Sequence, residues 1–484
     1  MKKINATNKH RVRQILCVTA AALGLNLTHP VWADVSFTTF DHGGDDWFSA
    51  VTAVSADGSV VTGTRSDYQG YSYEAFRWSV ETGATGLGHI THDFWGLGQG
   101  TDISADGSVI VGYDSVNSNE AYRWTAAGGM VGLGDLADGI DYSFASAVSA
   151  DGSIVIGTSV IGYNQNNSFI LKPFRWTVST GMQLVAGLDG ASAISADGKV
   201  LAGMKYTAYP TEFVAHRLTP TGVEALGELP GGGVLSNSTA VSTDGTVVVG
   251  YSSSNLGDEA FYWSQTTGMV GLGDLPGGAY QSYARSVSGN GKLVVGAAST
   301  SAGAEPFIWS ALTGMLSLKD LMIAEGVDMT NWKLLTASDI SQDGSTIVGD
   351  VTDASGKQLG YVLHLIDFDH DGYNQPADCD DFAPTVYPAA PEIKFDAIDQ
   401  NCNGYDLTIG VKQSVYFSST QNLVLRATSG LGRDAKLTVT GFGPMRWDET
   451  RQSWNLHIKN VTSAPASVII SGIEGKTTAT VSVR

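Results

Sequence analysis

A four-residue segment, Ser-Ala-Asp-Gly, recurs along the chain and constrains the fold more than any other feature. Four copies keep this sequence, and three looser copies vary at the second or third position. The seven copies begin at Ser55, Ser104, Ser149, Ser195, Ser242, Ser288 and Ser341. Their Asp or Asn positions follow one another at intervals of 45 to 53 residues. Such a period is typical of arrays in which each unit buries its apolar face only against its neighbours.

Each repeat unit has the pattern of four short strands. In the second unit, apolar runs at 101–104 and 109–113 flank Asp-Gly, a pair that favours a tight hairpin because Gly accepts positive φ. A third strand is expected at 120–124 and a fourth at 130–136. The 59 Gly residues suit short strands joined by tight turns. Seven such units predict an all-β fold, a seven-bladed β-propeller spanning residues 34–366.

The two ends of the repeat array complement each other. The last unit has strand patterns at 339–341, 346–350 and 358–366, but no fourth strand before an acidic loop. The segment 35–40, followed by Asp-His-Gly-Gly, is similar to a fourth strand that ends in Leu-Pro-Gly-Gly at 275–278. We therefore expect this N-terminal strand to complete the last blade and close the ring, which removes open sheet edges.

Besides Ser-Ala-Asp-Gly, the units contain Glu-Ala-Phe-Arg-Trp at 74–78 and Leu-Gly-Asp-Leu-Pro-Gly-Gly at 272–278. With these three segments the repeat resembles the HAF family of bacterial extracellular repeats over about residues 35–366. The resemblance implies export and a propeller-like fold, and it carries no established activity. The fourth unit departs most, with Glu-Phe-Val-Ala-His-Arg at 212–217 in place of the Trp strand.

Aromatic residues divide into those that follow the repeat and those that interrupt it. Recurrence at one position of the unit favours packing between blades over ligand binding for Trp78, Trp124, Trp176, Trp263 and Trp309. Loop residues that interrupt the repeat are better candidates for a site, namely His89, His92, Trp95, Tyr163, Tyr206 and Tyr209.

The first 33 residues have the pattern of a secretory signal peptide. Basic residues precede an apolar stretch at 15–25, and Val-Trp-Ala at 31–33 provides a cleavage site after Ala33. About 11 apolar residues fall short of the roughly 20 that a spanning helix needs, so an uncleaved anchor is the less favoured alternative. We expect a secreted, extracellular or periplasmic protein with no membrane span in the mature chain. A net charge of −20 makes nucleic acid an unsuitable partner.

An acidic segment follows the last repeat at 367–406. Residues 367–378 place oxygen ligands at positions 1, 3 and 5, Gly at 6 and a carboxylate at 12, which is the pattern of a calcium loop. A second pattern at 399–404 has Gly410 at position 12, so Asp380, Asp381 or Asp396 would have to complete it. The predicted metal ligands are Asp367, Asp369, Asp371, Tyr373, Gln375, Asp378, Asp380, Asp381, Asp399, Asn401 and Asn403.

The acidic segment also contains Asp-Cys-Asp-Asp at 378–381, Val-Tyr-Pro at 386–388 and Pro-Glu-Ile at 391–393, followed by the turn at 399–404. With these motifs it resembles the MopE-type metal-binding motif of bacterial surface proteins over roughly residues 367–405. The resemblance implies metal binding on an exported protein. Oxygen ligands without a His or thiolate cluster favour calcium over copper or zinc, and a solvated acidic linker is the alternative. A disulfide between Cys379 and Cys402 would hold the two halves together.

The C-terminal residues 407–484 alternate apolar and polar residues in short runs split by Gly and Pro. A small β-sandwich is therefore expected. Its Trp447 and Trp454 offer a sugar-binding surface as one interpretation, but core packing is favoured.

No catalytic motif is found along the chain. The nucleophile elbow, the zinc-protease motif and the P-loop are absent, and the His residues are scattered. We expect not an enzyme but a calcium-binding protein that serves as a non-catalytic binding or adhesion module for an unknown protein or polysaccharide. The alternative is a secreted polysaccharide-acting hydrolase or lyase, for which a carboxylate pair that breaks the repeat and faces the propeller channel would be evidence.

Overall fold

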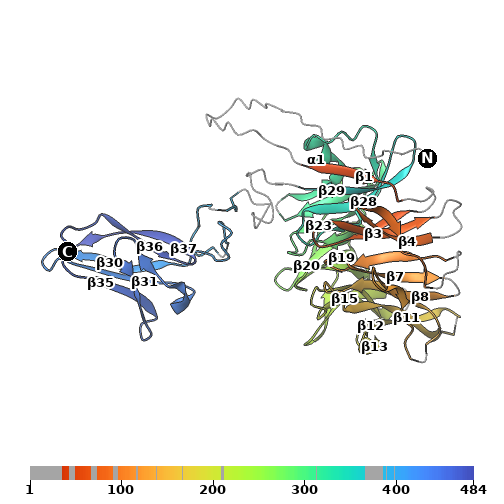
Figure 1. Ribbon diagram of the computed structural model, residues 1–484, viewed down its shortest axis with the longest axis horizontal. Coiled ribbons are helices and arrows are strands. Elements are labelled where there is room, and N and C mark those ends of the chain that lie inside the picture. The colour runs from red at the N-terminus through yellow and green to blue at the C-terminus, as the bar shows by residue number, and fades with distance from the viewer. Residues whose placement is uncertain are drawn as a thin grey trace. The chain divides into compact units, whose positions relative to one another are not determined.

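The structure is a computed structural model whose elements are almost all β-strands (Figure 1). It describes residues 35–42, 49–66, 73–90, 96–115, 118–137, 139–165, 167–208, 212–311, 313–365, 385–388, 390–396 and 398–484. The chain divides into two units, Met1–Ile366 and Asp367–Arg484. Within the described ranges, no helix is long and apolar enough to cross a bilayer.

Seven sheets make up the described part of the first unit, and six of them are antiparallel meanders of four strands. Sheets one to three contain β2 (Ala50–Val54), β3 (Val60–Ser66), β4 (Tyr73–Ser79), β5 (Gly83–Gly86); β6 (Gln99–Ile103), β7 (Val109–Ser115), β8 (Asn119–Thr125), β9 (Gly129–Gly132); β10 (Ser143–Val148), β11 (Ile154–Tyr163), β12 (Phe169–Thr177) and β13 (Gly181–Leu184). Sheets four to six contain β14 (Gly190–Ile194), β15 (Leu201–Ala208), β16 (Glu212–Thr219), β17 (Gly222–Gly227); β18 (Ser236–Val241), β19 (Val247–Ser253), β20 (Asp258–Ser264), β21 (Gly268–Gly271); β22 (Ser282–Val287), β23 (Leu293–Thr300), β24 (Gly303–Ser310) and β25 (Gly314–Ser317). The predicted β-propeller is confirmed, and the divergent fourth unit also forms its sheet.

The seventh sheet joins the two ends of the unit. It contains β1 (Ser36–Phe40), β26 (Lys333–Leu334), β27 (Asp339–Ile340), β28 (Thr346–Thr352) and β29 (Gln358–His364). The first strand, β1, pairs antiparallel with β29, with Thr38 opposite Val362. Figure 1 shows β1, in red, beside β29, in cyan. The N-terminal strand thus occupies the outer edge of the last sheet, as the strand count predicted.

The Ser-Ala-Asp-Gly turns are built by their own side chains. In the first copy, the buried Ser55 hydroxyl donates to Asp57 Oδ1 (2.8 Å) and accepts the N–H of Val60 (2.9 Å). Asp57 Oδ1 also accepts the N–H of Ser59 (3.0 Å), and Gly58 has φ +73°. A Cβ on Gly58 would lie 2.2 Å from Thr346 Oγ1 of the seventh sheet, so this turn requires glycine for both reasons.

Hydrogen bonds join each of these turns to the turn of the next sheet. The N–H of Ala56 donates to the carbonyl of Ala105 (3.0 Å), and the N–H of Ala105 donates to that of Ala150 (3.0 Å). The series continues through the later copies and returns to the start, where the N–H of Asp343 donates to the carbonyl of Ala56 (3.4 Å). Hydroxyls of the innermost strands add a second set, such as Thr52 Oγ1 to the Gly100 carbonyl (2.9 Å). The repeat therefore encodes contacts between sheets as well as hairpins.

Three of the recurring tryptophans, Trp78, Trp263 and Trp309, contact aromatic or cationic side chains of the neighbouring sheet, as the repeat predicted. Trp263 is 5% exposed, and the guanidinium carbon of Arg217 from the preceding sheet lies 4.6 Å from its ring centroid. Tyr262 occupies the position of Arg217 one sheet later and contacts Trp309 at 5.7 Å. Where the ends of the propeller meet, Phe40 of β1 stacks on Trp78 at 4.4 Å.

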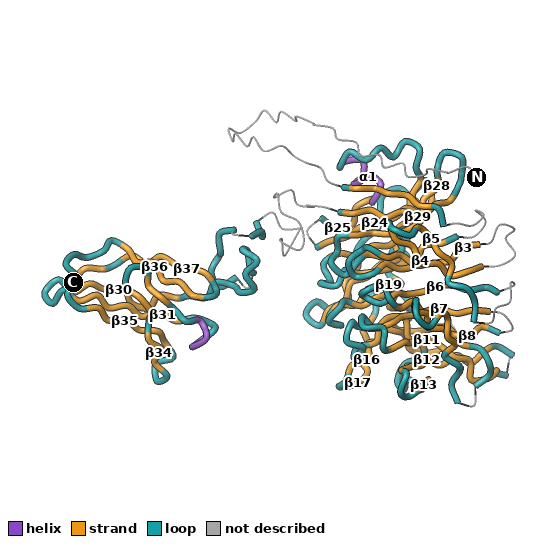
Figure 2. The backbone as a smooth tube through the Cα atoms, in the orientation of Figure 1, coloured by secondary structure: helices purple, strands orange, loops and turns teal. Residues whose placement is uncertain are grey.

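A short helix interrupts the strands of the otherwise all-β first unit. Helix α1 (Leu318–Ala324) follows β25, where the repeat has its longest interval, and Figure 2 shows it in purple. Ser317 caps its N-terminus by accepting the N–H of Asp320 (3.1 Å). Leu318 and Met322 are fully buried, so the extra residues of the last interval add a packed helix.

The second unit contains two sheets, in agreement with the expected β-sandwich. The first has β30 (Gly410–Phe417), β31 (Asn422–Thr428), β34 (Arg446–Asp448), β35 (Ser453–Ile458) and β38 (Ser482–Val483). The second has β32 (Thr438–Val439), β33 (Gly443–Pro444), β36 (Ser467–Gly472) and β37 (Gly475–Thr480), and a 3-10 helix spans Gly432–Ala435. Trp454 is 7% exposed and donates from Nε1 to the Gly432 carbonyl (2.8 Å), while Trp447 packs against it. Both tryptophans therefore belong to the core rather than to a sugar-binding surface.

Candidate functional site

The predicted metal ligands fall into two groups. Those in the first calcium-type pattern and its continuation lie outside the described residues, and so does Cys379; they are Asp367, Asp369, Asp371, Tyr373, Gln375, Asp378, Asp380 and Asp381. Asp399, Asn401 and Asn403 are described, together with Cys402. The geometry of the candidate centre can therefore be built from the second pattern.

The turn at 399–404 closes around the carboxylate of Asp399. Asp399 Oδ1 accepts the N–H of Asn403 (3.1 Å), and Oδ2 accepts the N–H of Gly404 (2.5 Å). Asn403 Oδ1 accepts the N–H of Tyr405 (2.9 Å), and Gly404 has φ +90°. Positions 1, 5 and 6 of the predicted loop thus lie within one tight turn.

Two residues outside the predicted ligand set hold this turn in place. The carboxylate of Glu392 accepts the N–H of Asn401 (2.9 Å) and that of Leu407 (3.3 Å). Gln400 is 2% exposed, and its amide accepts the N–H of Ile393 (3.0 Å) and donates to Asp396 Oδ2 (2.7 Å). No motif in the sequence marks Gln400, and its role follows only from the burial of its amide in the folded chain, because buried amides need partners.

The described part of the segment does not form a complete metal site by itself. Within the described residues, no group of three or more His, Cys, Asp or Glu side chains converges. Both oxygens of Asp396, one of the carboxylates considered for completing the loop, take part in hydrogen bonds to Ile398 and Gln400. The carboxylate and amide oxygens of Asp399, Asn401 and Asn403 are nevertheless the hard donors that suit calcium.

The inner strands of the propeller enclose a second candidate site. A cavity of about 210 Å³ is lined by residues of β2, β6, β10, β14, β18, β22 and β27, one strand from each sheet. Most of its wall repeats: Ala53, Ala147, Ala193 and Ala240 occupy one position of the unit. At that same position the second and seventh sheets carry Asp102 and Asp339.

Each of these carboxylates links neighbouring sheets. Asp102 Oδ2 accepts the N–H of Val148 from the third sheet (2.8 Å), and Oδ1 accepts that of Ile103 (2.8 Å). Asp339 Oδ2 accepts the N–H of Val54 from the first sheet (2.8 Å). Its Oδ1 accepts the Ser286 hydroxyl of the sixth sheet (2.5 Å) and the N–H of Ile340 (2.9 Å).

The surroundings of both carboxyl groups favour the protonated form. Burial, together with the charge of Asp339, raises the pKa of Asp102 to about 7. Burial likewise raises the pKa of Asp339 to about 6. Sequence reasoning named neither residue. Aligning the seven units position by position would have found them, because a charge stands where four other units have alanine.

Among the loop residues that interrupt the repeat, the three that the structure describes do not gather into a common site. His92, Trp95 and Tyr209 lie outside the described residues. His89 Nδ1 lies 2.8 Å from Asp114 Oδ1, and Tyr163 and Tyr206 contact Phe169 and Phe213. Each described member is thus engaged with its local neighbours.

One protein-family model matches the chain, over residues 378–406, and its description is "Putative metal-binding motif", of the MopE type. The match covers the second predicted loop and both cysteines, but not 367–377. No model of HAF repeats matches, so that resemblance remains unsupported. Comparison with curated proteins gives no match.

Solved structures similar to the chain include TolB from Acinetobacter baumannii, at 12% identity and a TM-score of 0.36, with 64% of each chain covered. The match thus spans less than two thirds of TolB. Another is the β-propeller domain of the Trilobed protease from Pyrococcus furiosus, at 12% identity and a TM-score of 0.41, covering 67% of this chain and 98% of that one. A third is hydrazine synthase from Kuenenia stuttgartiensis, at 12% identity and a TM-score of 0.38, covering 65% and 94%.

Proposed function

We propose that this chain is an exported, calcium-binding β-propeller protein that acts as a non-catalytic binding or adhesion module. The observation that carries the proposal is the coincidence of the metal-binding motif at 378–406 with the turn that closes around Asp399. Export follows from the signal-peptide pattern at 1–33, and a Cys379–Cys402 disulfide would join the two halves of the motif in an oxidising compartment.

Calcium is the metal best suited to the donors of this segment. Asp399, Asn401 and Asn403 offer carboxylate and amide oxygens, and the calcium-type pattern at 367–378 would add further carboxylates. Softer metals select thiolate or imidazole ligands, and both cysteines of the motif are assigned to the disulfide. When bound, the ion would supply positive charge that offsets the repulsion among these carboxylates.

A second candidate function has one specific observation in its favour. Asp102 and Asp339 break the repeat, line the axial cavity and have raised pKa values, and such features are frequent in the carboxylate pairs of glycoside hydrolases. However, every described hydrogen bond of these two carboxylates runs to a backbone or hydroxyl group of the propeller wall. We therefore favour a role in joining sheets, which leaves the binding module as the conclusion.

Calcium titration by calorimetry tests the metal site. With the wild-type chain, kept without reductant so that neither cysteine is reduced, we expect binding heat and a higher melting temperature. Two variants, Asp399→Asn and the triple change of Asp367, Asp369 and Asp371 to Ala, should weaken binding at least tenfold. Asp434→Asn, which alters an exposed carboxylate of the 3-10 helix, is the matched control and should bind as the wild type does. Absence of heat and stabilisation in the wild-type chain would refute the calcium site.

A second assay separates the two functions. Product release from neutral and acidic polysaccharides, measured as new reducing ends, should stay at background for both the wild type and Asp102→Asn. Turnover by the wild type that disappears in Asp102→Asn and Asp339→Asn would instead establish the hydrolase.

A further inference from the structure

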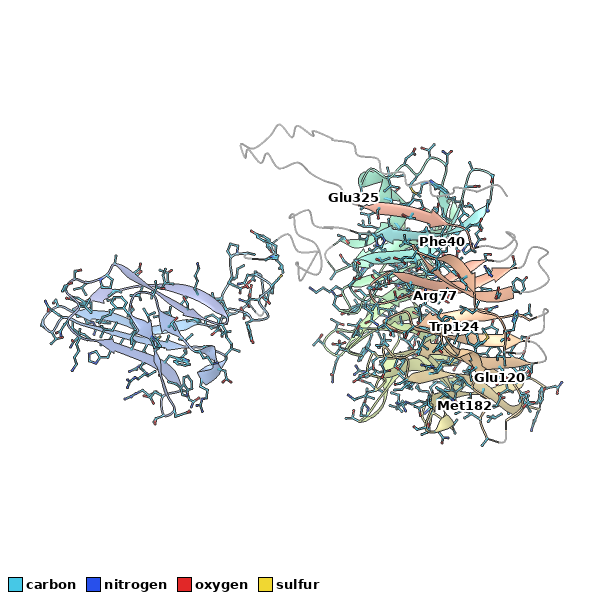
Figure 3. The ribbon with its side chains drawn as sticks, viewed as in Figure 1. Phe40, Arg77, Glu120, Trp124, Met182 and Glu325 are labelled. Carbon is cyan, nitrogen blue, oxygen red and sulfur yellow. The ribbon has the colours of Figure 1, made fainter. Side chains whose placement is uncertain are left out.

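A cavity of about 810 Å³ opens beside the first three sheets, on the side of the Asp-Gly turns. It is lined by Arg77 of β4, Arg123 and Trp124 of β8, and Asp106 and Asp151 of the turns, with several threonine hydroxyls around them. Figure 3 shows Arg77 and Trp124 on neighbouring sheets. Its volume is in the range of ligand pockets, roughly 300 to 1,000 Å³.

The fourth sheet shows what the same repeat position looks like when it is fully engaged. Arg217 Nη2 pairs with Glu224 Oε2 at 2.8 Å, and Nη1 donates to the Gly245 carbonyl (2.9 Å). Its guanidinium group also covers Trp263, which is only 5% exposed. The guanidinium group of Arg217 is therefore engaged in contacts that hold sheets together.

Arg77 and Arg123 occupy the position of Arg217 but lack its acidic partner. Arg217 stands opposite Glu224 on the neighbouring strand, whereas Arg77 stands opposite Thr85 and Arg123 opposite Val131. Each uses Nε to reach a turn carbonyl, Arg77 to Gly107 (3.3 Å) and Arg123 to Gly152 (3.0 Å). Both arginines line the cavity, and across the described ranges neither forms an ion pair within 4 Å, which leaves Nη donors available to a ligand.

The remaining walls offer acceptors and an aromatic face. Asp106 uses Oδ1 for all of its described hydrogen bonds, to Ser104 and Ser108. Trp124 is half-buried, as are Trp176 and Trp309, while Trp78 and Trp263 at the equivalent positions are 6% and 5% exposed; of the three half-buried rings, Trp124 is the one that lines this cavity. Two cations and two anions leave the lining without net charge, and the chain as a whole carries −20, which disfavours an anionic polymer.

We propose that this cavity binds a neutral hexopyranose glycan, with Trp124 as the stacking platform and Arg77, Arg123 and Asp106 as hydrogen-bonding partners of the sugar hydroxyls. A pyranose ring has an apolar face for the indole and an equatorial rim of hydroxyls that both donate and accept, which matches this lining. The inference rests on the binding role proposed above and narrows its ligand to one chemical class and one place.

Affinity electrophoresis through gels containing galactomannan, hydroxyethylcellulose, glycogen or the acidic polymer alginate tests the site. Wild-type mature chain should be retarded by at least one neutral polysaccharide and not by alginate. Trp124→Leu should weaken retardation at least tenfold; leucine stands naturally at this position as Leu218 in the fourth sheet, so the fold should tolerate it. Arg77→Gln should act in the same direction.

Matched controls lie one sheet further on. Trp176→Leu and Arg175→Gln make the same chemical changes at the same repeat positions outside the cavity and should leave retardation unchanged. No retardation by any neutral polysaccharide, retardation by alginate alone, or equal loss in Trp124→Leu and Trp176→Leu would each overturn the proposal. Calcium calorimetry on the same samples distinguishes the failures, because a chain that binds calcium but no glycan would refute this site alone.

Discussion

Replacing Asp102 by Asn should change the pH dependence of propeller stability. The pKa of this carboxyl rises from 3.8 to about 7 on folding because burial and the charge of Asp339 disfavour ionisation. The folded state therefore holds the proton more tightly than the unfolded state. Its stabilising effect is complete below pH 3.8 and is lost as the pH rises towards 7.

The magnitude follows from the size of the shift. At 1.36 kcal/mol per pKa unit, the shift of Asp102 has an upper value of about 4 kcal/mol. The carboxyl borders a cavity of about 210 Å³, large enough for water, so hydration reduces the cost of its charge. We therefore expect the free energy of unfolding of Asp102→Asn, relative to wild type, to rise by on the order of 2 kcal/mol between pH 4.5 and 8.

Guanidinium unfolding of both chains at half-unit pH steps measures this difference. Near pH 4.5 the variant should be the less stable chain by about 1 kcal/mol, because both carboxyl oxygens of Asp102 accept backbone N–H groups whereas asparagine has only one accepting oxygen. Asp106→Asn is the control of opposite sign, since hydrogen bonds from Ser108 and Ser104 lower the pKa of Asp106 and its contribution is lost on acidification. A stability difference for Asp102→Asn that is flat across this range, or that falls with pH, would refute the reasoning.

Three further changes test the packing. Phe40→Ala removes the ring that stacks on Trp78 where the propeller ends meet, and should lower the free energy of unfolding of the first unit by about 3 kcal/mol in denaturant titration. Arg217→Met leaves the Gly245 carbonyl and Glu224 without their partner, and should cost about 2 kcal/mol in the same titration. Glu474 is fully buried and accepts hydrogen bonds from Thr408 and Ser429. Glu474→Gln should therefore lower the free energy of unfolding of the second unit by about 1 to 3 kcal/mol, seen in calorimetry as a lower transition temperature for that unit and an unchanged one for the first.

The propeller could be predicted because its information is local and recurs. Each Asp-Gly turn contains the donors and acceptors that build it, from Ser55 to Val60, and the interval between turns counts the strands. The edge strand β1 was predictable from the strand that the last unit lacks. Helix α1 was missed because its stretch of 53 residues between turns gives no reason to prefer a helix over a longer loop.

The candidate sites were less accessible to sequence reasoning, for opposite reasons. The spacing within the acidic segment predicts its metal ligands, yet it does not predict that Gln400 and Glu392 anchor the turn around Asp399. The channel carboxylates Asp102 and Asp339 have no motif at all. That both line one cavity can be seen only after the inner strands of all the sheets are arranged around it, which is a property of the assembled propeller.

Some residues that depart from the repeat are accompanied by a second change that restores the lost hydrogen bond, and others are not. Where the second change is present, the departure has a structural explanation. In the third sheet, the N–H of Leu136 donates to Ser159, which donates to Asp135 (3.4 Å). In the second sheet and the loop before it, Asp114 replaces that serine and His89 replaces that aspartate. Their 2.8 Å contact raises the pKa of His89, and the N–H of Ile90 still finds an acceptor.

Such a paired exchange preserves the join between sheets and needs no ligand to explain it. Arg77 and Arg123 are the reverse case: the arginine is kept at its repeat position, while the acidic partner that Arg217 has in Glu224 is absent. A guanidinium group with more N–H donors than protein acceptors needs water or a ligand to accept the remaining hydrogen bonds. For that reason the uncompensated arginines around Trp124, rather than the His89–Asp114 pair, are where a ligand is expected.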